Sequence, residues 1–332
     1  MMHKAEGDAP LKQAWERFSL YDSNAVRRRA IFNQLLVWIL ILGVLGTILA
    51  LTQTQLRLQA QPASSAKTAR LIELLHYPVV VIPVVVSVLI AAANRFKLGT
   101  KWVLLRGGAE AIKREIFSYR TRAGDYSEQQ IEPNAKASLL AKQVEIVSSQ
   151  LMQTEVNVSA LRPYRGPIPP KMAGASATDD GLSPLSAEQY VNIRIGDQLN
   201  YFQTKILRLG RQLRLLQWGI YIFGGLGTLL AAFGYDLWIA LTTTISSILA
   251  TYIGLNEIEN SVTKYNQTAT DLLNVRDWWT ALSETEQTDQ QNVDKLVSYT
   301  EEILEGELTG WVQHMRDALT ELRHPQKVGN PS

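Results

Sequence analysis

Four long stretches of the chain contain no charged residue, and they constrain the fold more than any other feature. They lie between Arg29 and Arg57, Glu73 and Arg95, Arg214 and Asp236, and Asp236 and Glu257. Each stretch holds about the 20 mainly apolar residues that a helix needs to cross a hydrocarbon core of ~30 Å. The sequence therefore predicts an all-α membrane protein with four transmembrane helices, at about 31–53, 76–95, 215–234 and 237–255.

The remaining polar sequence limits the classes of partner and chemistry. Its 33 basic and 31 acidic residues give a net charge of +2, without the concentrated basic surface that nucleic-acid binding requires, so no nucleic-acid partner is expected. The chain contains no cysteine, which excludes disulfides, thiolate catalysis and cysteine-based metal sites. The four histidines are too scattered to suggest a metal site, and no group of residues suggests an enzyme or a cofactor.

Lysine and arginine residues gather at one end of each predicted pair of spans. Arg27 to Arg29 precede the first span, and six basic residues follow the second: Arg95, Lys97, Lys101, Arg106, Lys113 and Arg114. Lys205, Arg208, Arg211 and Arg214 precede the third span, whereas the turn before the fourth span offers only Gly234, Tyr235 and Asp236. Basic flanks stay in the cytoplasm, so both termini are predicted to face it, despite Arg57, Lys67 and Arg70 in the opposite loop.

The two halves of the chain look like a parallel duplication. Leu45–Ala50 in the first span and Leu226–Ala231 in the third have nearly the same sequence, and each half places its elements in the same order. The linker at 163–186 is rich in Pro, Gly and Ser and separates them. The predicted divisions are an N-terminal tail and amphipathic helix (1–30), a first repeat (31–162), the linker, a second repeat (187–323) and a flexible tail (324–332).

Apolar residues outside the spans recur at alternating steps of three and four. The first such series is Trp102, Leu105, Ala109, Ile112, Ile116 and Tyr119. Similar series precede the third span, from Ile195 to Leu213, and follow the fourth, from Ile258 to Leu272. This spacing is typical of helices that pack along a partner helix. It predicts a cytoplasmic layer of long, coiled-coil-like helices continuous with the spans.

The segment Trp102–Arg122, with the sequence WVLLRGGAEAIKREIFSYRTR, follows a pair of spans directly. It resembles the DUF4231 family and the related bacterial SLATT domains, over residues 20–125 closely and 190–285 more loosely. The resemblance implies a bacterial plasma membrane protein built from two-span hairpins with a cytoplasmic helix. It also implies a membrane effector, since the SLATT group is proposed to supply pores. The second half departs from the pattern: Glu257–Leu282 keeps Trp278 and Trp279 but lacks the Arg-x-x-Ala-Glu arrangement.

Hydroxyl and small residues form the candidate site within the spans. Thr244, Ser247 and Thr251 share one stripe of the fourth span, which either lines a pore or packs against another helix. Gly43 and Thr47 in the first span, and Gly224 and Thr228 in the third, are candidates for helix packing. No acidic or basic residue lies inside a span, which argues against a pump, a voltage sensor or an ion-coupled carrier.

Arg106, Lys113 and Arg114 form a second candidate site, for lipid headgroups or an anionic ligand. The alternative is a solvated helix face on which Glu110 pairs with Arg114 at helical spacing. Together, these features favour a non-enzymatic, homo-oligomeric pore or ion channel in the lipid bilayer. The alternative function is a non-conducting scaffold or signalling adaptor that presents its cytoplasmic helices to a protein partner.

Overall fold

A computed structural model describes residues 8–59, 66–96, 98–127, 133–170 and 179–323. Within these ranges the regular structure is entirely helical, which confirms the predicted all-α class. Four helices are long and apolar enough to cross a membrane, as the sequence predicts. The predicted flexible tail at 324–332 and the first seven residues of the predicted N-terminal tail lie outside the described residues.

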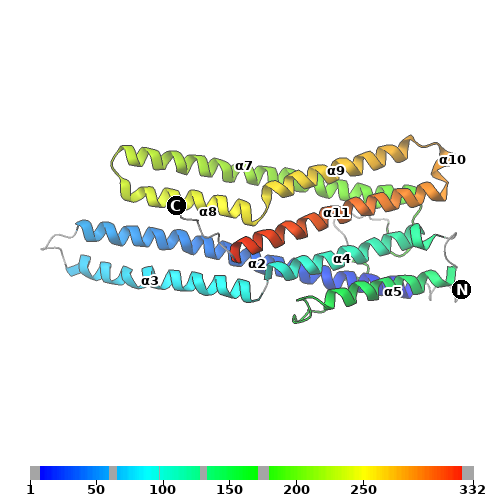
Figure 1. Ribbon diagram of the computed structural model, residues 1–332, viewed down its shortest axis with the longest axis horizontal. Helices are drawn as coiled ribbons and strands as arrows, with labels where there is room; N and C mark the ends of the chain where they lie inside the picture. The colour runs from blue at the N-terminus through cyan, green and yellow to red at the C-terminus, as the bar shows by residue number, and fades with distance from the viewer. Residues whose placement is uncertain (1–7, 60–65, 97, 128–132, 171–178, 324–332) are drawn as a thin grey trace, which may run out of the picture. The chain divides into compact units, whose positions relative to one another are not determined.

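The membrane-spanning segments belong to four helices that form two hairpins (Figure 1). The helices are α2 (Asp8–Gln59), α3 (Ala66–Arg95), α7 (Gly196–Ala232) and α8 (Asp236–Leu255). Helices α2 and α7 begin well before the apolar stretches that they contain. Each hairpin thus consists of one helix with a long polar extension and one shorter, mainly apolar helix.

The other elements connect or follow these hairpins. The longer helices are α4 (Leu98–Thr121), α5 (Pro133–Met152), α9 (Ile258–Ala281) and α11 (Gln290–Arg323). The shorter elements are η1 (Gly124–Tyr126), α6 (Ala187–Tyr190), the π-helical turn η2 (Val191–Ile195) and α10 (Glu284–Gln287).

The chain divides into two compact units. The soluble unit contains the residues up to Arg29, Gly99–Leu209 and Asn260–Glu321, and the membrane unit contains Ala30–Leu98 and Gly210–Glu259. Each unit takes segments from both halves of the sequence. The repeat boundaries at 31–162 and 187–323 follow a different division, by sequence likeness, and stay a prediction.

The soluble unit has one continuous apolar core. Leu105, Ala109, Ile112 and Ile116 of α4 are fully buried in it, and the apolar spacing of this segment is what places them on one face. Ile195, Leu199 and Phe202 before the third span, and Tyr265, Ala269 and Leu272 of α9, belong to the same core. Burial of these side chains at about 25 cal/mol per Å² is the main source of stability in this unit.

Glycines set the close approaches in the membrane unit. A Cβ atom at Gly219 or Gly227 of α7 would come within 2.8 Å of Leu249 or Thr242 of α8, so these two helices pack against each other with little space between them. On α2, Gly46 lies against Ile82 of α3 and Gly43 lies against Ile248 of α8. Small residues allow such contacts in lipid, where apolar burial gives helices no reason to associate.

Candidate functional site

Helix α8 presents two different faces. Its large apolar residues are all at least half-buried, whereas its exposed face consists of small and hydroxyl residues after Asp236: Ala240, Thr243, Ser247, Ala250, Thr251 and Gly254. The exposed faces of the other membrane helices are different, because they carry large apolar residues such as Trp38, Val84 and Trp218. Large apolar side chains suit contact with lipid tails, and the exposed face of α8 lacks them.

The predicted pore-lining residues lie on or beside this face. Ser247 and Thr251 are exposed, and Thr244 is half-buried, with its hydroxyl donating a hydrogen bond of 2.7 Å to the carbonyl of Ala240 in the same helix. Thr242 of α8 is buried on the opposite side, against Gly227. The stripe of Thr244, Ser247 and Thr251 therefore lies away from the contact between α7 and α8.

The residues predicted for helix packing fall into two groups. Gly43 and Thr47 lie on α2, where Gly43 faces α8 and the Thr47 hydroxyl donates to the Gly43 carbonyl at 3.0 Å. Gly224 and Thr228 are exposed on α7, with open space beside Gly224. Within one chain the packing positions of α7 are Gly219 and Gly227 instead. These lie on another side of the helix, and the packing role predicted for Gly224 and Thr228 from the spacing of small residues stays a prediction.

The three residues of the predicted cationic site, Arg106, Lys113 and Arg114, lie in different surroundings in the soluble unit. Arg106 forms ion pairs with Asp22 of α2 and, at 2.6 Å, with Glu110. Arg114 is partly exposed and pairs with Glu305 of α11. Glu110 therefore pairs with Arg106 rather than with Arg114, although both are four residues away. The pairing with Arg114 expected from spacing alone is absent because Glu305 reaches Arg114 from another helix.

Lys113 differs from the two arginines because it is buried. It lies near the ring of Phe18, with 5.8 Å between Nζ and the ring centroid. Burial lowers the pKa of Lys113 to about 8, since desolvation and repulsion from Arg194 and Arg106 outweigh the attraction of Glu110. Desolvation alone would raise the pKa of Glu110, but Arg106, Lys113 and Arg194 lower it to about 2.

Arg194 and Glu301 form the most deeply buried ion pair of the described residues, each with a side chain 2% exposed. Nε and Nη2 of Arg194 donate to the two carboxylate oxygens at 2.9 and 2.7 Å, and the Tyr190 hydroxyl donates to the same carboxylate at 2.9 Å. The guanidinium also lies 4.7 Å from the centroid of the Phe117 ring. Its remaining nitrogen, Nη1, is buried and has no hydrogen-bond partner in the described part of the protein.

The backbone around Arg194 is unusual too. Arg194 lies in the π-helical turn η2, between α6 and α7. Such turns are rare and occur frequently at functional sites, because the additional residue in the turn reorients neighbouring side chains. Sequence reasoning missed this site: the side chains of Arg194 and Glu301 meet across 107 positions, and no local spacing predicts that contact.

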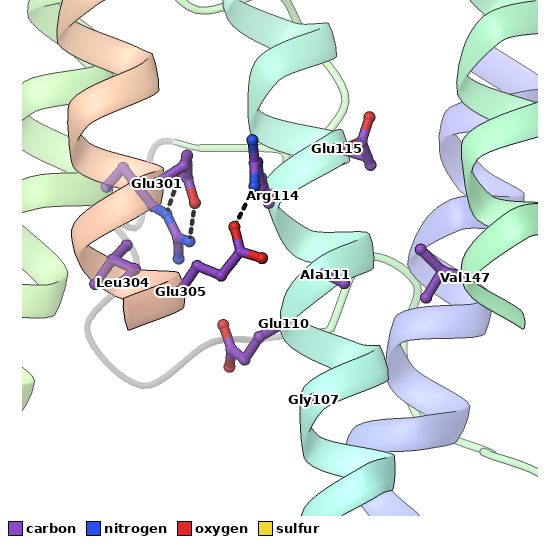
Figure 2. A pocket seen from close by; sticks show the side chains of 10 residues that line it. Gly107, Glu110, Ala111, Arg114, Glu115, Val147, Glu301, Leu304 and Glu305 are labelled. Atoms are coloured by element: carbon purple, nitrogen blue, oxygen red, sulfur yellow. Dashed lines mark hydrogen bonds and ion pairs between the residues drawn. The ribbon is translucent and has the colours of Figure 1, made fainter. Parts of the chain in front are cut away.

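A cavity of about 280 Å³ adjoins this ion pair in the soluble unit. It is lined from α4, α5, η2 and α11 by charged and apolar residues: Gly107, Glu110, Ala111, Arg114, Glu115, Val147, Arg194, Glu301, Leu304 and Glu305. Figure 2 shows Glu110 and the Arg114–Glu305 pair between α4 and α11. Among the described residues, no group of three or more His, Cys, Asp or Glu could hold a metal ion.

Helices α4 and α9 follow the second and fourth spans, and both contain 24 residues. Helix α4 buries Lys101, Lys113 and Arg120, whereas the buried polar residues of α9 are the hydroxyl residues Ser261 and Thr268. Trp279 near the end of α9 is buried in the soluble core, which agrees with packing rather than a place at the membrane interface. Of these two helices, the buried charged side chains thus belong to α4, the helix that follows the spans of the first half.

The part of the linker that follows residue 178 is held in place by side chains of α4 and α2. Arg120 of α4 is 1% exposed, forms an ion pair with Asp179 through both terminal nitrogens and donates from Nε to the Ser183 carbonyl at 2.9 Å. Trp15 Nε1 donates to the Gly181 carbonyl at 2.7 Å. The Arg120 side chain, which belongs to the DUF4231-like segment, therefore has a clear structural function.

Two family models match the chain, one in each half. Residues 16–134 match DUF4231, a family described as a protein of unknown function. Residues 190–311 match SLATT_1, described as the SMODS and SLOG-associating 2TM effector domain 1. The chain is a DUF4231/SLATT-related protein. The resemblance found in the segment Trp102–Arg122 is thus confirmed, and the departure of the second half corresponds to a match with a different model.

For this DUF4231/SLATT-related protein, the match in the second half indicates a membrane effector domain. The matched range contains η2, α7, α8 and α9 and thus both the hydroxyl face and Arg194. Comparisons with curated proteins and with solved structures found no match.

Proposed function

We propose that the protein is a non-enzymatic membrane effector that assembles from several copies of the chain into a pore or ion channel. The exposed face of α8 supports this proposal most directly. In a single copy, small and hydroxyl residues occupy positions where the neighbouring membrane helices carry large apolar side chains. A second copy or an aqueous path would cover such a face better than lipid tails.

Conduction requires groups that hydrate an ion without trapping it, and hydroxyls meet this requirement. Ser247 and Thr251 offer exposed hydroxyls along one line of α8, with Thr244 beside them. The spans contain no charged residue that would bind a permeating ion strongly. In the proposed assembly, α8 lines the axis and the apolar faces of α2, α3 and α7 contact lipid.

The proposal includes the orientation and location of the chain. The basic residues that flank the spans support a cytoplasmic location for both termini, and the family resemblance supports a bacterial plasma membrane as the location. The soluble unit would then lie in the cytoplasm, where it could respond to a protein partner. Neither a nucleic-acid partner nor a cofactor forms part of the proposal.

A non-conducting membrane scaffold is the second candidate, favoured by one observation. The Thr244 hydroxyl donates to its own helix at Ala240, which satisfies it without water. Small residues with hydroxyls satisfied in this way also suit tight packing between copies. In that case α8 would form a dry contact between copies, and the spans would only anchor the soluble unit for a cytoplasmic protein partner.

Flux from liposomes separates the two functions. Purified full-length protein is reconstituted into vesicles loaded with potassium ions and a small fluorescent dye, and release is measured over a range of protein-to-lipid ratios. The pore predicts release of ions that Ser247→Leu together with Thr251→Leu abolishes, while Thr228→Leu on the exposed face of α7 leaves it unchanged. Vesicles that release neither solute at any ratio, although the protein forms oligomers, would contradict the pore and favour the scaffold.

A further inference from the structure

We propose that the cavity of the soluble unit binds a small zwitterion, an α-amino acid with an aliphatic side chain. The ligand carboxylate would accept a hydrogen bond from Arg194, and its ammonium group would lie beside Glu110. This site does not depend on the pore activity, and a binding measurement tests it separately.

The carboxylate end follows from the unpartnered nitrogen of Arg194. Nη1 is buried with no hydrogen-bond partner among the described residues, in a side chain that is 2% exposed and lines the cavity. A buried donor without an acceptor is costly, and the cost is larger for a charged group. Glu301 does not relieve it, because this carboxylate meets the guanidinium from the side of Nε and Nη2, away from Nη1. An acceptor from outside the chain would complete the arginine.

The ammonium end follows from the carboxylates opposite. Glu110 pairs with Arg106 through one oxygen, and Glu305 pairs with Arg114. An ionised carboxylate has about four acceptor positions on its two oxygens, so Glu110 retains acceptor capacity toward the cavity. Figure 2 shows Glu110 and Glu305 near each other, between α4 and α11. Glu110 and Arg194 also interact electrostatically across this region.

The balance of charge favours a zwitterion over an ion of one sign. The lining contains four carboxylates and two guanidinium groups. Arg106 and Lys113 add two positive charges next to Glu110, so the charges around the cavity are balanced. A simple anion or cation would add an unbalanced charge, and a cation would also leave Nη1 of Arg194 without an acceptor. A molecule with both charges supplies each end with its partner and adds no net charge. Every unit charge placed without a partner in such a site costs free energy through desolvation.

Size and shape indicate the rest of the ligand. A cavity of about 280 Å³ is at the lower end of the range for small-molecule sites, which are typically ~300–1,000 Å³. Ala111, Val147 and Leu304 provide apolar walls. An aliphatic side chain of a few carbons would cover these walls, and an amino acid such as leucine combines such a side chain with both charged groups. Ordered water is the competing occupant, since it also satisfies buried polar groups.

Calorimetry on the full-length protein in nanodiscs tests the ligand class with three molecules. The probes are L-leucine, 4-methylpentanoate, which has the same carbon skeleton without the ammonium group, and 3-methylbutylamine, which lacks the carboxylate. The proposal predicts that L-leucine binds and that each analogue binds at least about tenfold more weakly, because it leaves one end of the site unpaired. Binding of an analogue as tight as that of leucine would overturn the zwitterion, and no binding of leucine would assign the cavity to water.

Four variants locate the binding in the cavity. Ala111→Leu fills the cavity without changing its charges, and Glu110→Gln removes one partner of the ammonium group. Their matched controls are Ala281→Leu and Glu302→Gln, at exposed positions of α9 and α11. Both cavity variants should lose leucine binding at least about tenfold, whereas the controls keep it. Thermal unfolding shows whether each variant is folded, and unchanged binding in a folded Ala111→Leu or Glu110→Gln protein would overturn the site.

Discussion

Several buried charged groups in the soluble unit are paired across helices, whereas several hydroxyl groups in the membrane unit bond within their own helix. Arg194 and Glu301 come from η2 and α11, and Arg106 reaches Asp22 on α2. By contrast, Thr47 and Thr244 donate to carbonyls four residues earlier in the same helix. The ion pairs therefore join helices of the soluble unit, whereas the hydroxyls of Thr47 and Thr244 join no helix to another.

The largest expected effect is at Glu301. Replacing it in Glu301→Gln leaves the buried guanidinium of Arg194 without a charged partner, which should reduce stability by about 3–5 kcal/mol. Thermal unfolding of the purified protein in detergent measures the loss. The exposed Glu302→Gln on the same helix is the control and should change stability by about 0.5 kcal/mol or less. Equal losses of stability in Glu301→Gln and Glu302→Gln would show that the buried ion pair does not hold the soluble unit together.

The second effect is a gain of stability in Lys113→Met. Burial lowers the pKa of Lys113 from the ordinary 10.5 to about 8, so the folded protein gives up a proton more easily than the unfolded chain. Between those pH values the unfolded chain binds more protons, and stability rises with pH. Below pH 8 the full cost, about 3 kcal/mol at most, is present, and Lys113→Met removes it.

Unfolding of the wild type and Lys113→Met from pH 7 to pH 10 tests this sign. The variant should be more stable at pH 7, and the difference should shrink as the pH rises above about 8. A variant that is less stable than the wild type at pH 7 would show that Lys113 contributes a favourable interaction with Glu110 that outweighs its burial.

The third effect is smaller because Arg114 is partly exposed. Its ion pair with Glu305 has side chains that are 43% and 57% exposed. Exposed pairs contribute about 0–1 kcal/mol, so Arg114→Ala should cost about 1 kcal/mol or less. Unfolding at low and high salt checks the reason, because salt should remove most of this small loss. A loss as large as that of Glu301→Gln would move Arg114 into the group of buried pairs.

The smallest effect is expected in the membrane unit, at Thr244→Val. The valine side chain has nearly the same shape and removes only a hydrogen bond within α8, so stability should change by about 0.5 kcal/mol or less. Thermal unfolding in detergent is the measurement. A loss well above 1 kcal/mol would instead indicate that the hydroxyl has a partner in another copy of the chain.

Local sequence patterns predict much of this fold. Charge-free stretches locate the four apolar helices, since a bilayer excludes charge over a defined length. The three-and-four spacing places Leu105, Ala109 and Ile112 on the buried face of α4. Both patterns depend on residues within a few turns of each other, where helix geometry is fixed.

The candidate sites depend on contacts that local patterns do not contain. The Arg106–Asp22 and Arg194–Glu301 pairs join segments far apart in the chain, and only the packing of the soluble unit brings them together. The cavity beside Arg194 has the same origin. Likewise, the exposed side of α8 is defined by which of its residues face Gly219 and Gly227 of α7. The hydroxyl stripe itself is visible in the sequence, but its exposure is not.

Charge modification at a single introduced cysteine tests the pore most directly. The chain contains no cysteine, so Thr251→Cys provides one reactive thiol on the exposed face of α8, and Thr228→Cys provides a control on the exposed face of α7. Both variants are reconstituted in planar bilayers and treated with a charged, membrane-impermeant thiol reagent. A pore lined by α8 predicts that the reagent changes the current through Thr251→Cys and not through Thr228→Cys. The absence of any current, or a current that modification of Thr251→Cys leaves unchanged, would contradict it.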